Sequence, residues 1–199
     1  MLKRQFDVLC AGIGLVVLSP VIILIGLVLL LFQKGPILFV QERIGKGGKP
    51  FNIYKFRSMK TTSEQDGQPR LAQTNDKRQT TIGRFLRKHH LDELPQLWNV
   101  LKGDMSIVGP RPERQFYINQ IIERNPRYVE LFQVRPGLTS YATLYNGYTD
   151  TIEKMLRRLS MDLIYLRHHT MCFDLKIILL TIVAMIQGNY SAGRDSFTL

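Results

Sequence analysis

The chain has 199 residues, a formal net charge of +11, and 45% hydrophobic residues. This length fits one domain with one attached membrane element. The excess of positive charge indicates an anionic partner, such as nucleic acid, an anionic membrane surface or a phosphorylated substrate. The only two cysteines, Cys10 and Cys172, exclude a disulfide framework and a zinc site built from paired cysteines.

An uncharged apolar run covers residues 8–32 and is long enough to cross a bilayer as a helix, for which about 20 residues suffice. Because no small-residue cleavage site follows it, we expect a retained membrane segment. Ser19 and Pro20 lie near its centre, where proline removes a helical hydrogen bond and serine favours a bend. Cations flank both ends, and the positive-inside rule assigns both flanks to the cytoplasm. These features alone leave a re-entrant hairpin and a kinked spanning helix equally open.

Two short strands are predicted next, at residues 37–40 and 51–59, joined by a glycine-rich turn at residues 45–50. Lys55 and Arg57 share one face of the second strand because strand side chains alternate. The two cations suit a pyrophosphate, although a solvated edge or contact with lipid head groups explains them more simply when they are taken alone. A polar loop is expected at residues 61–77.

Helical spacing resumes at residues 82–89, which include Arg87. A second helix is predicted to begin with Asp92 as its N-cap and to stop at Gly103. The adjacent carboxylates of Asp92 and Glu93 would then lie at a helix N-terminus that attracts phosphate, where they could bind Mg²⁺ or attack phosphorus. The alternative is an ordinary capping residue beside a surface acid.

A brief strand at residues 106–108 precedes Pro110-Arg111-Pro112. The two prolines hold Arg111 in an extended turn, which suits phosphate binding at low entropic cost. One or two amphipathic helices on the membrane surface are predicted at residues 117–132, and a further helix with many cations at residues 152–168. The apolar segment at residues 175–186 is too short to span a membrane, and the tail from residue 188 is expected to fray.

Together these segments resemble the small monotopic phosphoglycosyl transferases of the bacterial sugar transferase family. The similarity covers nearly the whole chain, and its motifs in combination are highly specific. They are Lys3-Arg4-x-x-Asp7, Ser19-Pro20, Gln41-Glu42-Arg43-Ile44-Gly45, Gly48-Lys49-Pro50-Phe51, Ile53-Tyr54-Lys55-Phe56-Arg57-Ser58-Met59, Leu91-Asp92-Glu93-Leu94-Pro95 continuing through Pro110-Arg111-Pro112, and Arg135-Pro136-Gly137-Leu138-Thr139.

The resemblance implies an α+β fold, mainly helical, with a small β-hairpin and amphipathic helices at the membrane interface. Residues 1–34 would form a re-entrant membrane helix broken at Ser19 and Pro20. Residues 35–199 would form the catalytic domain, facing the cytoplasm at the bacterial inner membrane. Because the large N-terminal extension of longer relatives is absent, we expect the minimal catalytic form.

The resemblance also implies a reaction that initiates glycan assembly. Asp92 would attack the β-phosphate of a UDP-sugar, release UMP and form a covalent phosphosugar intermediate. A polyprenyl phosphate, namely undecaprenyl phosphate, would then attack that intermediate. Mg²⁺ would bind at Asp92, and Glu93 would position the dyad or assist proton transfer. Phosphate contacts are expected from Lys55, Arg57, Arg87, Arg111 and Arg135.

One segment departs from the family pattern. Many relatives continue Gly-Trp-Ala-Gln-Val-Asn-Gly-Arg after Thr139, whereas this chain has a different run from Ser140 to Tyr148 without the arginine. The change bears on sugar or nucleotide selection and not on the dyad. Two alternative functions are a membrane-anchored hydrolase of nucleotide diphosphates and a non-enzymatic basic membrane adaptor. No nucleic-acid motif is present, so we expect no nucleic-acid partner.

Overall fold

The apolar N-terminal run forms two helices, α1 (Leu2–Val17) and α2 (Ser19–Phe32), which meet at a bend of 59°. The structure is a computed structural model that describes residues 2–63, 69–73, 76–146 and 149–187. At the bend, the Ser19 hydroxyl donates to the carbonyl of Val16 at 2.8 Å, and Pro20 lies in the first turn of α2. The predicted break at Ser19 and Pro20 is therefore confirmed.

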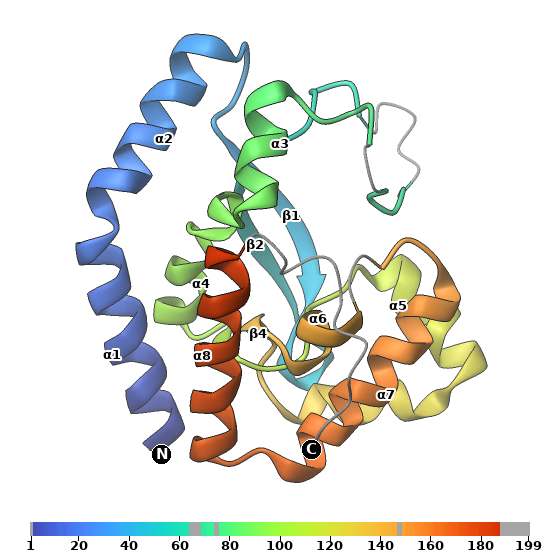
Figure 1. Ribbon diagram of the computed structural model, residues 1–199. Helices are drawn as coiled ribbons and strands as arrows, with labels where there is room; N and C mark the ends of the chain where they lie inside the picture. Colours follow the sequence, from blue (N-terminus) through green and yellow to red (C-terminus); the bar gives the residue numbers. More distant parts are fainter. Residues whose placement is uncertain (1, 64–68, 74–75, 147–148, 188–199) are drawn as a thin grey trace.

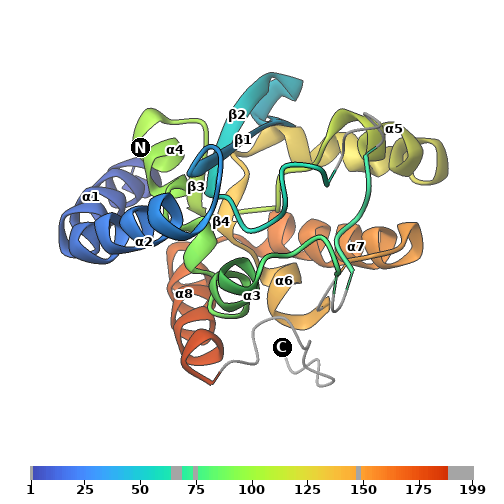
Figure 2. The ribbon, with the colours of Figure 1, turned by 90° about the horizontal axis from the view of Figure 1, so that it is seen from above.

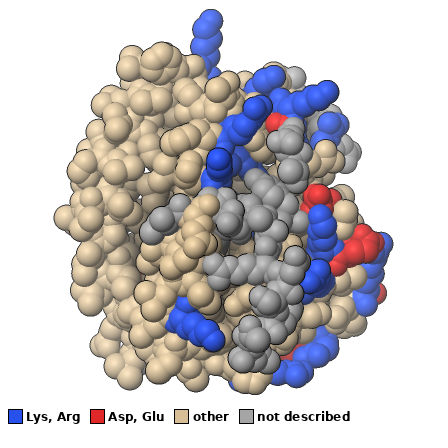
Figure 3. All heavy atoms as spheres, viewed as in Figure 1, with Lys and Arg blue, Asp and Glu red and all other residues tan. Residues whose placement is uncertain are grey.

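The helix pair forms one flank of the molecule, with α5 and α7 on the opposite side (Figures 1 and 2). Most of the large apolar side chains of α2 are exposed, and the face over both helices carries almost no charge in Figure 3. No single helix of the described chain is long and apolar enough to cross a membrane, whereas the bent pair together meets that test of length and composition.

Polar side chains at the start of α1 tie this flank to the rest of the protein. The buried Asp7 carboxylate accepts hydrogen bonds from the Ser106 hydroxyl at 2.9 Å and the Ile107 N–H at 3.0 Å. Arg4 donates to two carbonyls in the last turn of α4 (Gln96–Lys102), at 2.6 and 2.8 Å. Cations stabilise the negative end of a helix, so α1 is held to α4 by both hydrogen bonding and charge.

The predicted hairpin is confirmed, and its strands differ in extent from the prediction. β1 (Leu38–Ile44) pairs antiparallel with β2 (Pro50–Phe56) across a short 3₁₀ turn at Lys46–Gly48. Arg57 follows the last residue of β2, and its N–H still donates to the carbonyl of Ile37 at 2.8 Å. The alternation of strand side chains therefore continues as far as Arg57.

A second, parallel pair joins β3 (Ser106–Val108) to β4 (Gly137–Thr139), a strand that the sequence analysis did not predict. The two chains approach very closely where Gly109 passes Gly137. A methyl group on Gly137 would lie 2.1 Å from the Gly109 nitrogen, so only glycine fits there. This contact gives a physical reason for the glycine in the segment that follows Arg135.

The remaining elements are helical. The region predicted as one or two amphipathic helices at residues 117–132 forms two, separated at Asn125, whose side chain caps the second. The bounds are α3 (Thr81–Lys88), a 3₁₀ turn η2 (Leu91–Glu93), α5 (Gln115–Arg124), the 3₁₀ segment η3 (Pro126–Gln133), α6 (Tyr141–Asn146), α7 (Ile152–His168) and α8 (Met171–Ile186). The tail expected to fray from residue 188 lies outside the described residues, as does part of the loop at 61–77.

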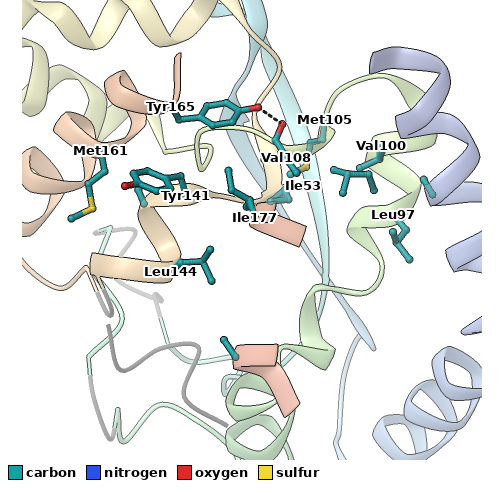
Figure 4. Packing of buried hydrophobic residues seen from close by; sticks show 14 residues of the cluster. Ile53, Leu97, Val100, Met105, Val108, Tyr141, Leu144, Met161, Tyr165 and Ile177 are labelled. Carbon is teal, nitrogen blue, oxygen red and sulfur yellow. Dashed lines mark hydrogen bonds between the residues drawn. The ribbon is translucent and has the colours of Figure 1, made fainter. Parts of the chain in front are cut away.

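The main core lies between α4, β3, α6, α7 and α8, where Val100, Met105 and Val108 are almost fully buried (Figure 4). The Tyr165 side chain lies in this core. Its hydroxyl is within hydrogen-bond distance of the Val108 carbonyl at 3.3 Å and of the Asp174 carboxylate at 2.7 Å. The core thereby supports β3 directly upstream of Pro110-Arg111-Pro112.

The hydrogen bonds from β3 to the Asp7 carboxylate contribute to the free energy of unfolding. We expect Asp7→Ala to lower the free energy of unfolding by about 3 kcal/mol, because it leaves two buried donors without an acceptor. Ser106→Ala removes one of these donors and should cost only about 1 kcal/mol. Denaturant unfolding of both variants in detergent tests this, and equal losses would contradict it.

Candidate active site

A cavity of about 610 Å³ opens beside the dyad. Its walls are β1, β2 and the residues after β2, the turn that carries Asp92 and Glu93, the segment 111–117, and parts of α6 and α7. Among the described residues nine lysine and arginine side chains line it against three carboxylates, so the cavity attracts anions. The nine are Arg43, Lys55, Arg57, Lys60, Arg70, Arg87, Arg111, Arg114 and Arg158.

The backbone before the dyad turns sharply. His90 has a φ of 54°, the left-handed region, where no other non-glycine residue of the described chain is found. Asp92 and Glu93 then occupy their own 3₁₀ turn, and α4 begins only after Pro95. The prediction that Asp92 caps the second helix is therefore wrong, because the left-handed residue redirects the chain into a separate turn.

The buried carboxylate of Glu93 is held by two cations from distant parts of the chain. Its Oε1 accepts from Lys55 Nζ at 2.6 Å and from Arg111 Nη2 at 2.7 Å. Burial alone would raise the pKa of Glu93, but Arg111 and Lys55 outweigh it and hold the pKa well below its usual value. Burial also lowers the pKa of Lys55, and Glu93 offsets part of that shift. We conclude that Glu93 is ionised at neutral pH.

Asp92 is different from its neighbour. It is only 5% exposed, yet no described residue forms a hydrogen bond or ion pair with its carboxylate. Burial and the adjacent Glu93 carboxylate raise the pKa of Asp92, while Lys55, Arg87 and Arg111 oppose the shift. Asp92 therefore presents unshared lone pairs beside a positive cavity, as a nucleophile or a metal ligand requires.

Arg87 and His90 complete the surroundings of the dyad. Both line the cavity, and the buried Arg87 Nε has no hydrogen-bond partner among the described residues. The pKa of His90 is lowered to about 4, mainly by burial; Glu93 opposes this shift, and Arg111, Lys55 and Arg87 add to it. His90 is therefore neutral at neutral pH.

Arg57 lines the cavity but does not contact the dyad. Its Nη2 donates to the carbonyl of Lys34 at 2.8 Å, and its Nε lies 3.4 Å from the side-chain oxygen of Gln33. Both partners follow the end of α2. Arg57 thus connects the cavity to the apolar flank.

Arg135 is not brought to the site. It does not line the cavity, and its Nε donates to the carbonyl of Gly103 at 2.8 Å, at the carboxyl end of α4. A cation at this end of a helix satisfies orphan carbonyls and opposes the helix dipole, so Arg135 has a structural contact here, and its phosphate contact stays a prediction.

A buried charge cluster that no sequence motif predicted also lines the cavity. Glu113 accepts from Arg158 Nη2 at 2.6 Å and from Arg43 Nη1 at 3.0 Å. Burial opposes ionisation, but Arg158 and Arg43 hold the pKa of Glu113 below its usual value. The position of Glu113 directly after Pro110-Arg111-Pro112 was the available signal, whereas no spacing rule joins it to a residue 45 positions away.

One carboxylate of the site, that of Asp92, is suited to bind Mg²⁺. No group of three histidine, cysteine, aspartate or glutamate side chains that could hold a metal ion occurs in the described part of the chain. However, Mg²⁺ usually keeps several waters and binds through one or two carboxylates together with substrate phosphates. The unpartnered carboxylate of Asp92 fits that pattern, and Glu93 is already committed to Lys55 and Arg111.

Comparison with known sequences decides the family. Residues 1–188 match the profile of a family described as bacterial sugar transferase. The chain belongs to this family.

The chain is similar to several curated proteins. It is 38% identical over 187 residues to the UDP-N-acetylgalactosamine-undecaprenyl-phosphate N-acetylgalactosaminephosphotransferase of Aeromonas hydrophila, covering 94% of this chain and 44% of that protein. It is 44% identical to the UDP-glucose:undecaprenyl-phosphate glucose-1-phosphate transferase of Escherichia coli (strain K12), covering 92% and 39%. The chain thus spans less than half the length of these two relatives. It is 38% identical to the exopolysaccharide production protein PSS of Rhizobium leguminosarum bv. phaseoli, covering 92% and 94%.

The neutral His90 makes the stability of the protein depend on pH. The folded pKa of about 4 lies below the reference value of 6.5, so the unfolded chain binds a proton in this window that the folded chain does not. Stability is therefore lost as the pH falls from 6.5 towards 4. We expect His90→Asn, which tolerates the left-handed backbone, to remove up to about 3 kcal/mol of this loss. Denaturant unfolding across this pH range tests it, and parallel curves for both proteins would contradict it.

Proposed function

We propose that this sugar transferase moves a sugar 1-phosphate from a UDP-sugar to a polyprenyl phosphate, such as undecaprenyl phosphate, and releases UMP. The observation that carries the proposal is the buried Asp92 carboxylate, which has no partner among the described residues and lies beside an ionised Glu93 in a cavity lined by cations. The names of the Aeromonas and Escherichia coli relatives support both substrates. We further propose that the reaction initiates glycan assembly, as the name of the Rhizobium relative supports.

The first half-reaction forms a covalent intermediate. An Asp92 carboxylate oxygen attacks the β-phosphorus, the bond between this phosphorus and the oxygen bridging to the α-phosphorus breaks, and UMP leaves with that oxygen. Lys55, Arg87 and Arg111 lie around the dyad and would stabilise negative charge on the transferring phosphoryl group. Displacement at phosphorus depends mainly on such positioning and charge stabilisation.

The second half-reaction restores the enzyme. A phosphate oxygen of the polyprenyl phosphate attacks the phosphorus bound to Asp92, and the aspartyl oxygen leaves as a carboxylate. The product carries the sugar on a lipid diphosphate. The acceptor phosphate is already ionised near neutral pH, so this step needs no strong base. The low pKa of Glu93 and its two ion pairs favour a positioning role for Glu93 over proton transfer.

We propose Asp92 as the residue that would hold Mg²⁺, together with donor phosphate oxygens. The ion would supply neutralisation of phosphate charge when it is bound. The fit rests on the free carboxylate of Asp92 and on the commitment of Glu93 to Lys55 and Arg111.

We also propose that α1 and α2 form a re-entrant membrane segment, with the catalytic residues facing the cytoplasm at the bacterial inner membrane. The bend of 59°, the exposed apolar side chains of α2 and the positive flanks of the run support this arrangement. The interface is where a soluble sugar nucleotide and an insoluble polyprenyl chain can bring their phosphates together.

The central test is UMP release from a panel of UDP-sugars, with purified protein, Mg²⁺ and undecaprenyl phosphate. We expect Asp92→Asn to reduce release by at least about a thousandfold, because the amide is a poor nucleophile. The exposed Glu123→Gln serves as a charge-matched control and should keep wild-type activity.

Other outcomes of this assay separate the alternatives. Release that does not depend on the lipid would favour a nucleotide-diphosphate hydrolase. A folded wild type that releases nothing from any donor would favour the non-enzymatic adaptor.

The ion pairs of Glu93 predict the acid limb of the pH profile. Lys55 lowers the pKa values of both Glu93 and Asp92, so its loss should raise them. We expect Lys55→Met to move the acid limb of kcat/KM to higher pH by about one unit or more, and Lys55→Arg to restore it. An unchanged acid limb with a lower kcat would show that Lys55 acts only on the substrate.

A further inference from the structure

A second cavity, of about 520 Å³, lies where α2 ends. Its walls are Phe32–Lys34, Met59–Thr62, Thr80–Ile82 and Arg57. None of these residues is acidic, and all belong to the described chain. Arg57 and Met59–Thr61 also line the larger cavity, so the two cavities share a wall.

The strongest sign of a ligand is Arg57 itself. It is only 6% exposed, and no described carboxylate pairs with its guanidinium. Its Nη1 is buried and has no hydrogen-bond partner among the described residues. A buried cation without a counterion lowers the stability of the folded protein, because no attraction to an anion offsets the loss of its hydration. An anion bound beside Arg57 would remove that cost.

The neighbouring groups suit a phosphate. Lys34 and Lys60 add positive charge, and the first turn of α3 begins at Thr81 on the cavity wall. Free N–H groups of a helix N-terminus favour phosphate oxygens. The Thr80 hydroxyl accepts from Gly83 N at 2.9 Å and from Gln33 Nε2 at 2.7 Å, and these two bonds leave its hydrogen available to donate. The donors of the cavity wall are thus cationic side chains, threonine hydroxyls and the N–H groups at the start of α3.

The approach to the cavity is apolar. The last residues of α2 expose large hydrocarbon side chains: Leu30 is 61% exposed, Leu31 75% and Phe32 73%. Phe32 also forms part of the cavity wall. A ligand that fits both features has an anionic head and a hydrocarbon chain lying along α2.

We propose that this cavity docks the phosphate of the polyprenyl acceptor, separately from the site of the nucleotide diphosphate. The inference rests on the proposed function. A phosphate monoester carries nearly two negative charges at neutral pH, which matches Arg57 with Lys34 and Lys60 better than a singly charged phospholipid diester does. Because Arg57 lines both cavities, the phosphate keeps contact with the same guanidinium as it moves to the phosphosugar on Asp92.

Lys34→Glu tests the docking site, because Lys34 is exposed and lines only the smaller cavity. We expect the KM for undecaprenyl phosphate in phosphatidylcholine nanodiscs to rise about tenfold, since an attraction becomes a repulsion. Exchange of labelled UMP into the UDP-sugar without acceptor should persist. The matched control is Lys49→Glu, at the exposed tip of the hairpin and outside both cavities, and its acceptor KM should stay at the wild-type value.

Two kinetic results would overturn the proposal. One is an unchanged acceptor KM in Lys34→Glu. The other is a defect that appears only when phosphatidylglycerol is added to the nanodiscs, which would assign the cavity to a phospholipid head group.

Failure of the proposed function is recognised separately, as a wild type with neither UMP exchange nor transfer. In that case, direct binding of radiolabelled undecaprenyl phosphate to the same nanodiscs decides the docking site. Weaker binding by Lys34→Glu than by Lys49→Glu supports it, and equal binding overturns it.

Discussion

The Glu93 carboxylate, shared between Lys55 and Arg111, is the interaction on which the site depends. Two adjacent buried carboxylates repel each other, and burial adds a further cost to each charge. The two cations remove that cost for Glu93, so that the unpartnered Asp92 remains free for chemistry. They come from a β-hairpin and a proline-bounded turn, two rigid elements that hold the guanidinium and ammonium groups in place.

Charged side chains are distributed unevenly over the molecule. Two of the three carboxylates that line the cavity are paired with cations, Glu93 with Lys55 and Arg111, and Glu113 with Arg43 and Arg158. At the neighbouring cavity, at the end of α2, Lys34, Arg57 and Lys60 line the wall and no lining residue is acidic. The apolar flank carries almost no charge (Figure 3). A phosphorylated lipid matches such a surface because it combines both characters in one molecule.

Much of this arrangement was predictable from the sequence, and particular residues show where prediction stopped. The break at Ser19 and Pro20 follows from local chemistry, and so does the alternation that puts Lys55 and Arg57 on one side of a strand. The left-handed His90 was not predictable, because a histidine in that conformation is held by tertiary context. The contact of Arg135 was not predictable for a similar reason: its partner, the Gly103 carbonyl, is 32 residues away, and nothing local distinguishes a helix-capping arginine from one that binds phosphate.

The hydrogen bonds of α1 carry a consequence for the evolution of the chain. Arg4 and Asp7 contact α4, directly after the dyad, and β3, directly before the turn of Arg111. The N-terminal segment is therefore apolar and, at the same time, attached by hydrogen bonds to the elements that position the active-site residues. An unrelated hydrophobic helix of equal length could replace its affinity for lipid but not its two polar attachments. We therefore expect Arg4 and Asp7 to vary less among relatives than the apolar residues of the same segment.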